Sequence, residues 1–98
     1  MPGHDLVEQV RSIRPALRAR GVAHLAIFGS RARGDHRPDS DLDILLDVEP
    51  GFPFSILHLV GVEQLVSEAV GIPANAFMSR SLDPGFRESI VSDLCQVF

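Results

Sequence analysis

The sequence contains no lysine and a single cysteine, and both shortages limit what the protein can be. Cys95 has no second cysteine to pair with, so we expect a reducing, cytoplasmic environment, and its apolar neighbours predict a packed core thiol. Nine basic residues, all arginine, stand against thirteen acidic ones, which gives a net charge of −4. Broad nucleic-acid binding relies on surplus positive charge, so we expect no direct contact with nucleic acid.

Long hydrophobic runs are also missing. The most apolar stretch, residues 52–70, is interrupted by polar side chains at His58, Glu63, Gln64 and Glu68. A membrane helix needs about 20 consecutive apolar residues, so the sequence predicts no membrane span. Residues 1–8 carry two acidic side chains and no apolar run flanked by positive charge, which is not the pattern of a secretory signal.

What the chain does contain is enough apolar material for one core. With 98 residues and 45% hydrophobic content, it falls in the size range of one compact domain and is too short for two. We therefore predict a single domain over residues 1–98. Phe52, Phe54 and Phe98 exceed what one small core readily hides, which favours pairing with a partner or with a second copy of the chain.

Hydrophobic periodicity predicts the helices and strands. A first helix is expected over residues 5–20, ended by Gly21 and kinked or split at Pro15. A second helix is expected over residues 55–70. A final helix over residues 84–98 follows from an Asp-Pro start and from apolar residues at intervals of four: Phe86, Ile90, Leu94 and Phe98.

Short apolar runs predict three strands, at residues 22–28, 41–48 and 74–78. The resulting order α-β-β-α-β-α is that of an α/β protein in which helices pack on a small sheet. Because the connection between the first two strands is short, we expect the sheet to be mixed.

The first predicted strand ends at Gly29 and Ser30, which together can hold an anion. Gly29 allows the backbone to approach a ligand closely, and Ser30 offers a hydroxyl and an amide at the start of a helical turn, where partial positive charge favours phosphate. The lysine and the spacing of a Walker loop are missing. A glycine-serine pair by itself is more often a plain turn than a phosphate site.

Asp41 and Asp43 open the second predicted strand. Residues two apart on a strand point to one face with Cα atoms about 6.6 Å apart, so both carboxylates can converge on a metal ion. Two neighbouring carboxylates repel each other, and either solvent or a divalent cation must relieve that repulsion. Oxygen ligands favour Mg²⁺ or Mn²⁺. Taken by itself, an Asp-x-Asp pair is more often a solvated strand end.

Together, these two features resemble the signature of the nucleotidyltransferase superfamily, specifically its minimal branch. The resemblance rests on Gly-Ser-Arg-Ala-Arg-Gly at positions 29–34, followed by Ser40, Asp41, Leu42 and Asp43. It continues more faintly through the second helix to the final one, and it implies a nucleotidyltransferase fold.

By this resemblance, Gly29 and Ser30 would hold the triphosphate of ATP. Asp41 and Asp43 would be the catalytic carboxylates that ligate Mg²⁺, with Asp41 also at the nucleotide. Arg31 and Arg33 would contact the phosphates, or one of them would be a surface residue paired with Asp35 or Asp39.

The same resemblance implies a function. Members of this branch commonly act as antitoxins paired with a HEPN-domain toxin, and some transfer AMP from ATP to a tyrosine of the toxin. The chain is therefore expected to be a Mg²⁺-dependent protein adenylyltransferase with such a partner. Larger relatives that act on nucleic-acid ends need added domains, and an acidic chain of 98 residues would repel a polynucleotide and lacks room for them.

One position departs from the family pattern. The family places a third carboxylate on the next strand, where it joins the metal site and helps to take the proton from the attacking hydroxyl. Here that position corresponds to Asn75, and no Asp or Glu occurs between Glu68 and Asp83. An asparagine oxygen can ligate Mg²⁺ but cannot act as a base near neutral pH. The alternative is a catalytically impaired, nucleotide-binding antitoxin that neutralises its partner by binding alone.

Overall fold

The computed structural model describes residues 3–98 of the chain. Within these residues, four strands form one sheet in the order β3-β2-β1-β4. The strands are β1 (Val22–Phe28), β2 (Leu42–Val48), β3 (Ala74–Met78) and β4 (Cys95–Gln96). β1 is antiparallel to β2 and β4, whereas β2 and β3 are parallel. The predicted α/β fold with a mixed sheet is therefore confirmed.

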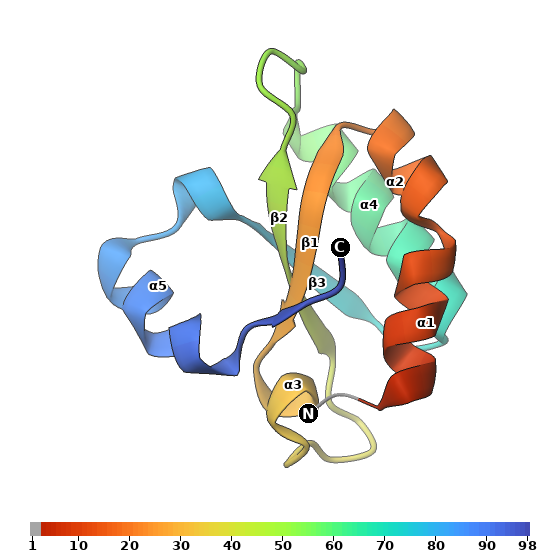
Figure 1. Cartoon of the computed structure of the whole chain (residues 1–98), viewed down its shortest axis with the longest axis vertical. Coiled ribbons are helices and arrows are strands. Elements are labelled where there is room, and N and C mark those ends of the chain that lie inside the picture. The colour runs from red at the N-terminus through yellow and green to blue at the C-terminus, as the bar shows by residue number, and fades with distance from the viewer. Residues whose placement is uncertain (1–2) are drawn as a thin grey trace.

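Helices α1 (His4–Ser12), α2 (Arg14–Ala19) and α4 (Ile56–Val70) lie along one face of the sheet (Figure 1). The predicted first helix is split, because Pro15 lies in the first turn of α2, where its missing N–H costs no helical hydrogen bond. Gly21 follows with a φ of 92°, a left-handed conformation that favours glycine and ends the helical segment.

The main core lies between the sheet and these helices. Alternate residues of a strand point to the same face, so β1 and β2 each direct an apolar row toward the helices. Its fully buried members include Val10, Leu17, Leu25, Ile27, Leu42, Ile44, Leu46, Val62 and Val66. Asp43 lies between two of these residues in β2, so its side chain points to the opposite face of the sheet.

The opposite face is covered in part by α5 (Pro84–Ile90). Asp83 caps this helix, because its Oδ2 accepts hydrogen bonds from the backbone N–H groups of Gly85 and Phe86 at 3.0 and 3.3 Å. The Phe86 ring packs against the rings of Phe28 and Phe77, with centroids 6.0 and 5.7 Å apart. These aromatic contacts attach α5 to β1 and β3.

The final helix is shorter than predicted, and its expected extent over residues 84–98 is wrong beyond Ile90. A 3-10 turn, η2 (Val91–Asp93), leads from α5 into β4. β1 offers its backbone edge here: Leu25 accepts a hydrogen bond from the N–H of Val97 at 2.9 Å and donates to the carbonyl of Phe98 at 3.2 Å. A continued helix would leave these edge groups of β1 without partners.

Two further expectations about side chains are corrected. Cys95 is half-buried in the edge strand β4 rather than packed in the core. Phe52, Phe54 and Phe98 are also half-buried, so they are not the apolar side chains that remain exposed outside the core. The large exposed apolar side chains are instead Ile56, Leu57, Val60, Phe86, Val91 and Leu94.

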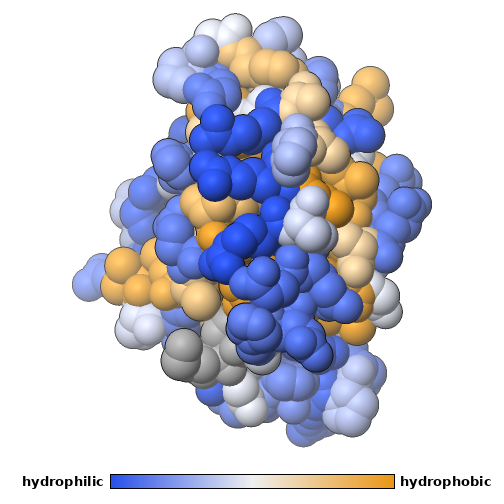
Figure 2. All heavy atoms as spheres, turned by 45° about the vertical axis from the view of Figure 1, so that its right-hand side comes forward, coloured by the Kyte–Doolittle hydropathy of each residue, from blue (hydrophilic) through white to orange (hydrophobic). Residues whose placement is uncertain are grey.

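The surface is otherwise mostly polar. Figure 2 shows hydrophilic side chains surrounding smaller hydrophobic areas on the side that α1, α2 and α4 occupy. Among residues 3–98, no helix has the length and apolar character that crossing a membrane requires.

Candidate nucleotide and metal site

The site begins where β1 ends, at Gly29. Its φ of 78° and ψ of −158° lie in a region that essentially only glycine adopts. A Cβ atom built on Gly29 would stand 2.6 Å from Oδ2 of Asp43, closer than any real contact. The missing side chain therefore allows the turn backbone to lie directly against the Asp43 carboxylate.

Ser30 follows as the first residue of α3 (Ser30–Arg33). The Gly29 carbonyl begins the hydrogen bonding of this single helical turn. It accepts hydrogen bonds from the N–H groups of Ala32 and Arg33 at 3.1 and 3.0 Å. Gly34, with a φ of 84°, ends it. Ser30 is half-buried and lies beside the residue that contacts Asp43, so the glycine-serine turn and the acidic residues belong to one site.

Asp41, Asp43 and Asn75 converge at the start of β2 and β3. The parallel register of these strands sets Asp43 opposite Asn75. The Nδ2 group of Asn75 donates to Oδ2 of Asp41 at 3.1 Å and, more weakly, to Oδ1 of Asp43 at 3.5 Å. The described residues hold no group of three His, Cys, Asp or Glu side chains that could surround a metal ion. The donor set at this position is thus two carboxylates and one amide.

Electrostatics at the pair are unfavourable for a second negative charge. The pKa of Asp43 is raised above the ordinary value of 3.8, first because burial disfavours the charged carboxylate and further because Asp41 is close. The hydrogen bond from Asn75 and the positive charge of Arg33 act in the opposite direction without cancelling the rise. A cation bound to these carboxylates would offset this penalty.

Arg31 holds the loop that carries Asp41. Its Nε and Nη2 groups donate to the carbonyl oxygen of Ser40 at 3.1 and 2.8 Å, and Nη2 also donates to the carbonyl of Pro38 at 3.4 Å. Ser40 directly precedes Asp41 in the chain. The Arg31 guanidinium therefore fixes the backbone from which this carboxylate projects.

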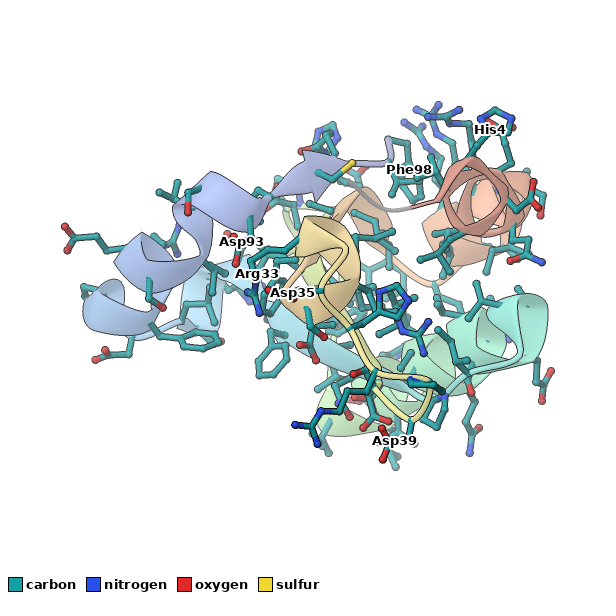
Figure 3. All side chains as sticks on the ribbon, turned by 90° about the horizontal axis from the view of Figure 1, so that it is seen from below. His4, Arg33, Asp35, Asp39, Asp93 and Phe98 are labelled. Carbon is teal, nitrogen blue, oxygen red and sulfur yellow. The ribbon has the colours of Figure 1, made fainter. Side chains whose placement is uncertain are left out.

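Arg33 pairs with two carboxylates outside the acidic pair. Its Nε lies 3.1 Å from Asp35 and its Nη1 lies 2.8 Å from Asp93, and Figure 3 shows the three side chains gathered at α3. Asp39 lies at the far end of the loop in the same view, away from Arg33. Of the two surface partners considered for an arginine, the structure thus contains the pair with Asp35.

Sequence reasoning missed Asp93, which ties η2 to α3 through Arg33. Sixty positions separate these two residues, so no local spacing could have revealed the contact. It also missed the clamp of Arg31 on Ser40, because that bond uses a backbone carbonyl, which every residue has.

Two acids at the start of an interior strand, beside a glycine-serine turn, are the arrangement of a nucleotidyltransferase. Residues 10–94 match the family described as nucleotidyltransferase domain, and the chain belongs to this family. The protein adenylyltransferase MntA of Thermococcus cleftensis is 33% identical over 96 residues, which cover 93% of this chain and 95% of that protein. The resemblance noted from the sequence is therefore confirmed.

The fold also resembles that of solved toxin-antitoxin structures. A toxin-antitoxin crystal structure with AMP-PNP has a TM-score of 0.73 at 18% identity, covering 92% of this chain and 72% of that one. A complex of the tri-AMPylated Shewanella oneidensis HEPN toxin with its MNT antitoxin has a TM-score of 0.66 at 15% identity, covering 94% and 71%. These likenesses confirm the nucleotidyltransferase fold.

Proposed function

We propose that the chain is a Mg²⁺-dependent protein adenylyltransferase that moves AMP from ATP to a hydroxyl group of a HEPN-type toxin and so acts as its antitoxin. The observation that carries this proposal is the convergence of Asp41 and Asp43 beside Gly29. Membership of the nucleotidyltransferase family and the similarity to an archaeal protein adenylyltransferase support it.

The residues present fit a magnesium ion. Mg²⁺ prefers oxygen ligands and is commonly held by one or two carboxylates together with substrate phosphates. Asp41 and Asp43 supply those carboxylates, and the raised pKa of Asp43 reflects a negative charge that a cation would stabilise. When bound there, Mg²⁺ would neutralise charge on the triphosphate oxygens.

The turn residues would hold the nucleotide. Without a side chain at Gly29, the turn backbone lies against Asp43. Ser30, next to it, offers a hydroxyl and an amide donor to phosphate oxygens. We assign Arg31 and Arg33 to the nucleotide side of the site, Arg31 through the loop that it fixes. Arg33 would have to exchange Asp35 or Asp93 for a phosphate, since its guanidinium is already paired with both.

In the proposed reaction, the acceptor hydroxyl oxygen forms a bond to the α-phosphorus of ATP. The bond between that phosphorus and the bridging oxygen to the β-phosphate breaks, and pyrophosphate leaves. The hydroxyl proton must pass to a base other than Asn75, because an amide does not accept a proton near neutral pH. The acceptor protein or solvent would supply that base.

This missing base favours one alternative, a catalytically impaired antitoxin that binds nucleotide and neutralises its partner by binding alone. The specific observation is that Asn75 donates hydrogen bonds to both acids, where a carboxylate would accept a proton.

Intact-mass measurement of a co-expressed HEPN-type partner separates the two functions. We expect the partner to gain the mass of one adenylyl group, which is AMP less one water, for each modified hydroxyl in the presence of the natural chain. The double variant Asp41→Ala, Asp43→Ala should give no gain, whereas Asp39→Ala, which removes a nearby exposed carboxylate, should preserve it. A stoichiometric complex whose partner keeps its original mass would establish the alternative.

A further inference from the structure

Asn75 is the only asparagine of the chain. Its side-chain amide donates to both acids. Its Nδ2 group has two N–H bonds, one for each carboxylate. The acceptor oxygens, Oδ2 of Asp41 and Oδ1 of Asp43, are 3.1 and 3.5 Å away. The side-chain amide therefore presents its donor end, and not its oxygen, to the acidic pair.

The position of this amide conflicts with a second metal ion. In two-metal sites the ions lie about 3.5–4 Å apart and share the surrounding carboxylates. Mg²⁺ approaches its oxygen ligands to about 2.0–2.1 Å, so an ion cannot stand between Asp41 and Asp43 at the place that Nδ2 occupies while these hydrogen bonds persist. The amide fills that place with a neutral donor.

The charges lead to the same count. Two carboxylates carry two negative charges, which one divalent cation balances, whereas a third carboxylate would favour a further cation. Asn75 removes that third charge. Its N–H groups still relieve part of the repulsion between Asp41 and Asp43 through the hydrogen bonds that they donate to both carboxylates.

We propose that the Asn75 amide takes the place of a second metal ion, so that the pair of Asp41 and Asp43 holds a single divalent cation. This inference rests on the proposed function only where that function assigns a metal ion to the pair. Asn75 is in this sense a positioning residue, because it acts through the two carboxylates.

The number of bound ions tests the proposal. With Mn²⁺ as the probe, counted by electron paramagnetic resonance, the natural chain should bind one ion and the Asn75→Asp variant two. Gln9→Glu makes the same amide-to-acid change on α1, on the other side of the sheet, and should leave the count at one. Two ions in the natural chain, or one in Asn75→Asp, would overturn the inference alone. No ion in either would overturn the proposed function with it.

Nuclear magnetic resonance of the side-chain amides tests the hydrogen bonds directly, since only one asparagine contributes. Asn75, Gln9 and Gln64 are all exposed, so only its hydrogen bonds should make the Asn75 amide protons exchange more slowly than those of the two glutamines. Asp41→Ala should abolish the difference. Saturating Mg²⁺ should leave the protection in place. Loss of protection on adding Mg²⁺ would mean that the amide turns its oxygen to the ion, which contradicts the proposal.

Discussion

Gly29 is constrained twice, by its backbone angles and by the carboxylate that lies against it. Replacing it with alanine should cost about 1–3 kcal/mol of folding stability, because a side chain is strained in this region of φ and ψ. The new Cβ would also displace Asp43, whose Oδ2 lies 2.6 Å from the position that it would take. Gly29→Ala should therefore weaken Mg²⁺ and ATP binding in calorimetry as well as lower Tm.

Gly51→Ala is the matched control for this variant. Gly51 also has a positive φ, 83°, but a Cβ there would meet no atom within 4 Å. This variant should lose stability and keep its affinity for Mg²⁺ and ATP. Equal losses of affinity in both variants would show that backbone strain, rather than contact with Asp43, controls binding.

Asp43 should make stability depend on pH in the absence of metal. A carboxyl group whose folded pKa is raised contributes stability below its unfolded pKa and loses that contribution as pH rises through the folded value. Asp43→Asn should thus raise Tm at pH 7 in EDTA, with a gain that shrinks on acidification through the raised pKa and vanishes below about 3.8. Thermal unfolding at several pH values measures this.

The exposed Asp39 serves as the control for Asp43, and its asparagine variant should show no comparable gain. Adding Mg²⁺ should reverse the order of stability, because the natural chain gains a ligand that Asp43→Asn holds poorly. A Tm at pH 7 in EDTA that is unchanged or lower in Asp43→Asn would contradict the burial argument.

At the scale of elements, the loop between α3 and β2 depends on Arg31. Hydrogen bonds to a charged group contribute about 1.5–3 kcal/mol each when well protected. Because Arg31 is only half-buried, we expect Arg31→Ala to lower the free energy of unfolding by about that amount in total, and not by that amount for each of its bonds. We expect the affinity for Mg²⁺ to fall as well, because no guanidinium then holds the Ser40 carbonyl and the backbone before Asp41. Calorimetric titration with Mg²⁺ alongside thermal unfolding measures both effects.

Arg37 offers a control in the same loop. It is exposed, and its backbone N–H, rather than its guanidinium, donates a hydrogen bond to the Ser40 hydroxyl. Arg37→Ala should therefore change neither Tm nor Mg²⁺ affinity appreciably. A similar loss in both variants would mean that positive charge near the acids, not the clamp, is responsible.

Elements with a strong local signal were predictable from the sequence, and those that depend on distant partners were not. β1 and β3 have the predicted bounds, and α4 begins one residue later than expected, because apolar spacing and glycine punctuation are local properties. The spacing of Ile90, Leu94 and Phe98 fits a helix, yet the chain forms β4 there because β1 has a free edge with which it pairs. Pairing with the edge of a distant strand leaves no signal in a local sequence pattern.

The same division applies to the site. The residues that converge, Gly29, Asp41, Asp43 and Asn75, were all singled out from the motif and from the family resemblance. What the sequence could not supply was the direction of the Asn75 amide or the partners of Arg31 and Arg33. These depend on side-chain geometry and on contacts between distant segments.

At the scale of the whole molecule, ligand binding and folding should be linked. A ligand that binds only the folded chain adds about 2.7 kcal/mol at 100 times its Kd, which for a domain of this size corresponds to roughly 10 °C or more in Tm. We expect such a rise with Mg²⁺ and ATP together, measured by thermal unfolding, and none in the double variant Asp41→Ala, Asp43→Ala.

Leu17→Ala separates general stability from binding in this experiment. Leu17 is fully buried on α2, and its truncation should cost about 2–5 kcal/mol. Because the residue lies in the main core, across the sheet from the acids, the variant should unfold earlier yet show the same rise with ligand. A lost rise in Leu17→Ala would indicate that the whole fold, and not the acids, sets affinity.

The antiparallel pairing of β1 with β2 gives the molecule two unlike poles. Val22 pairs with Val48 at one end, and Phe28 pairs with Asp43 at the other, so the turn at residues 49–53 lies a full strand length from the acids. Figure 1 shows this turn and α3 at opposite ends of the sheet. A fluorophore, an affinity tag or an inserted peptide at Gly51 would accordingly sit far from the chemistry, which makes this turn a natural attachment point for following the protein at work.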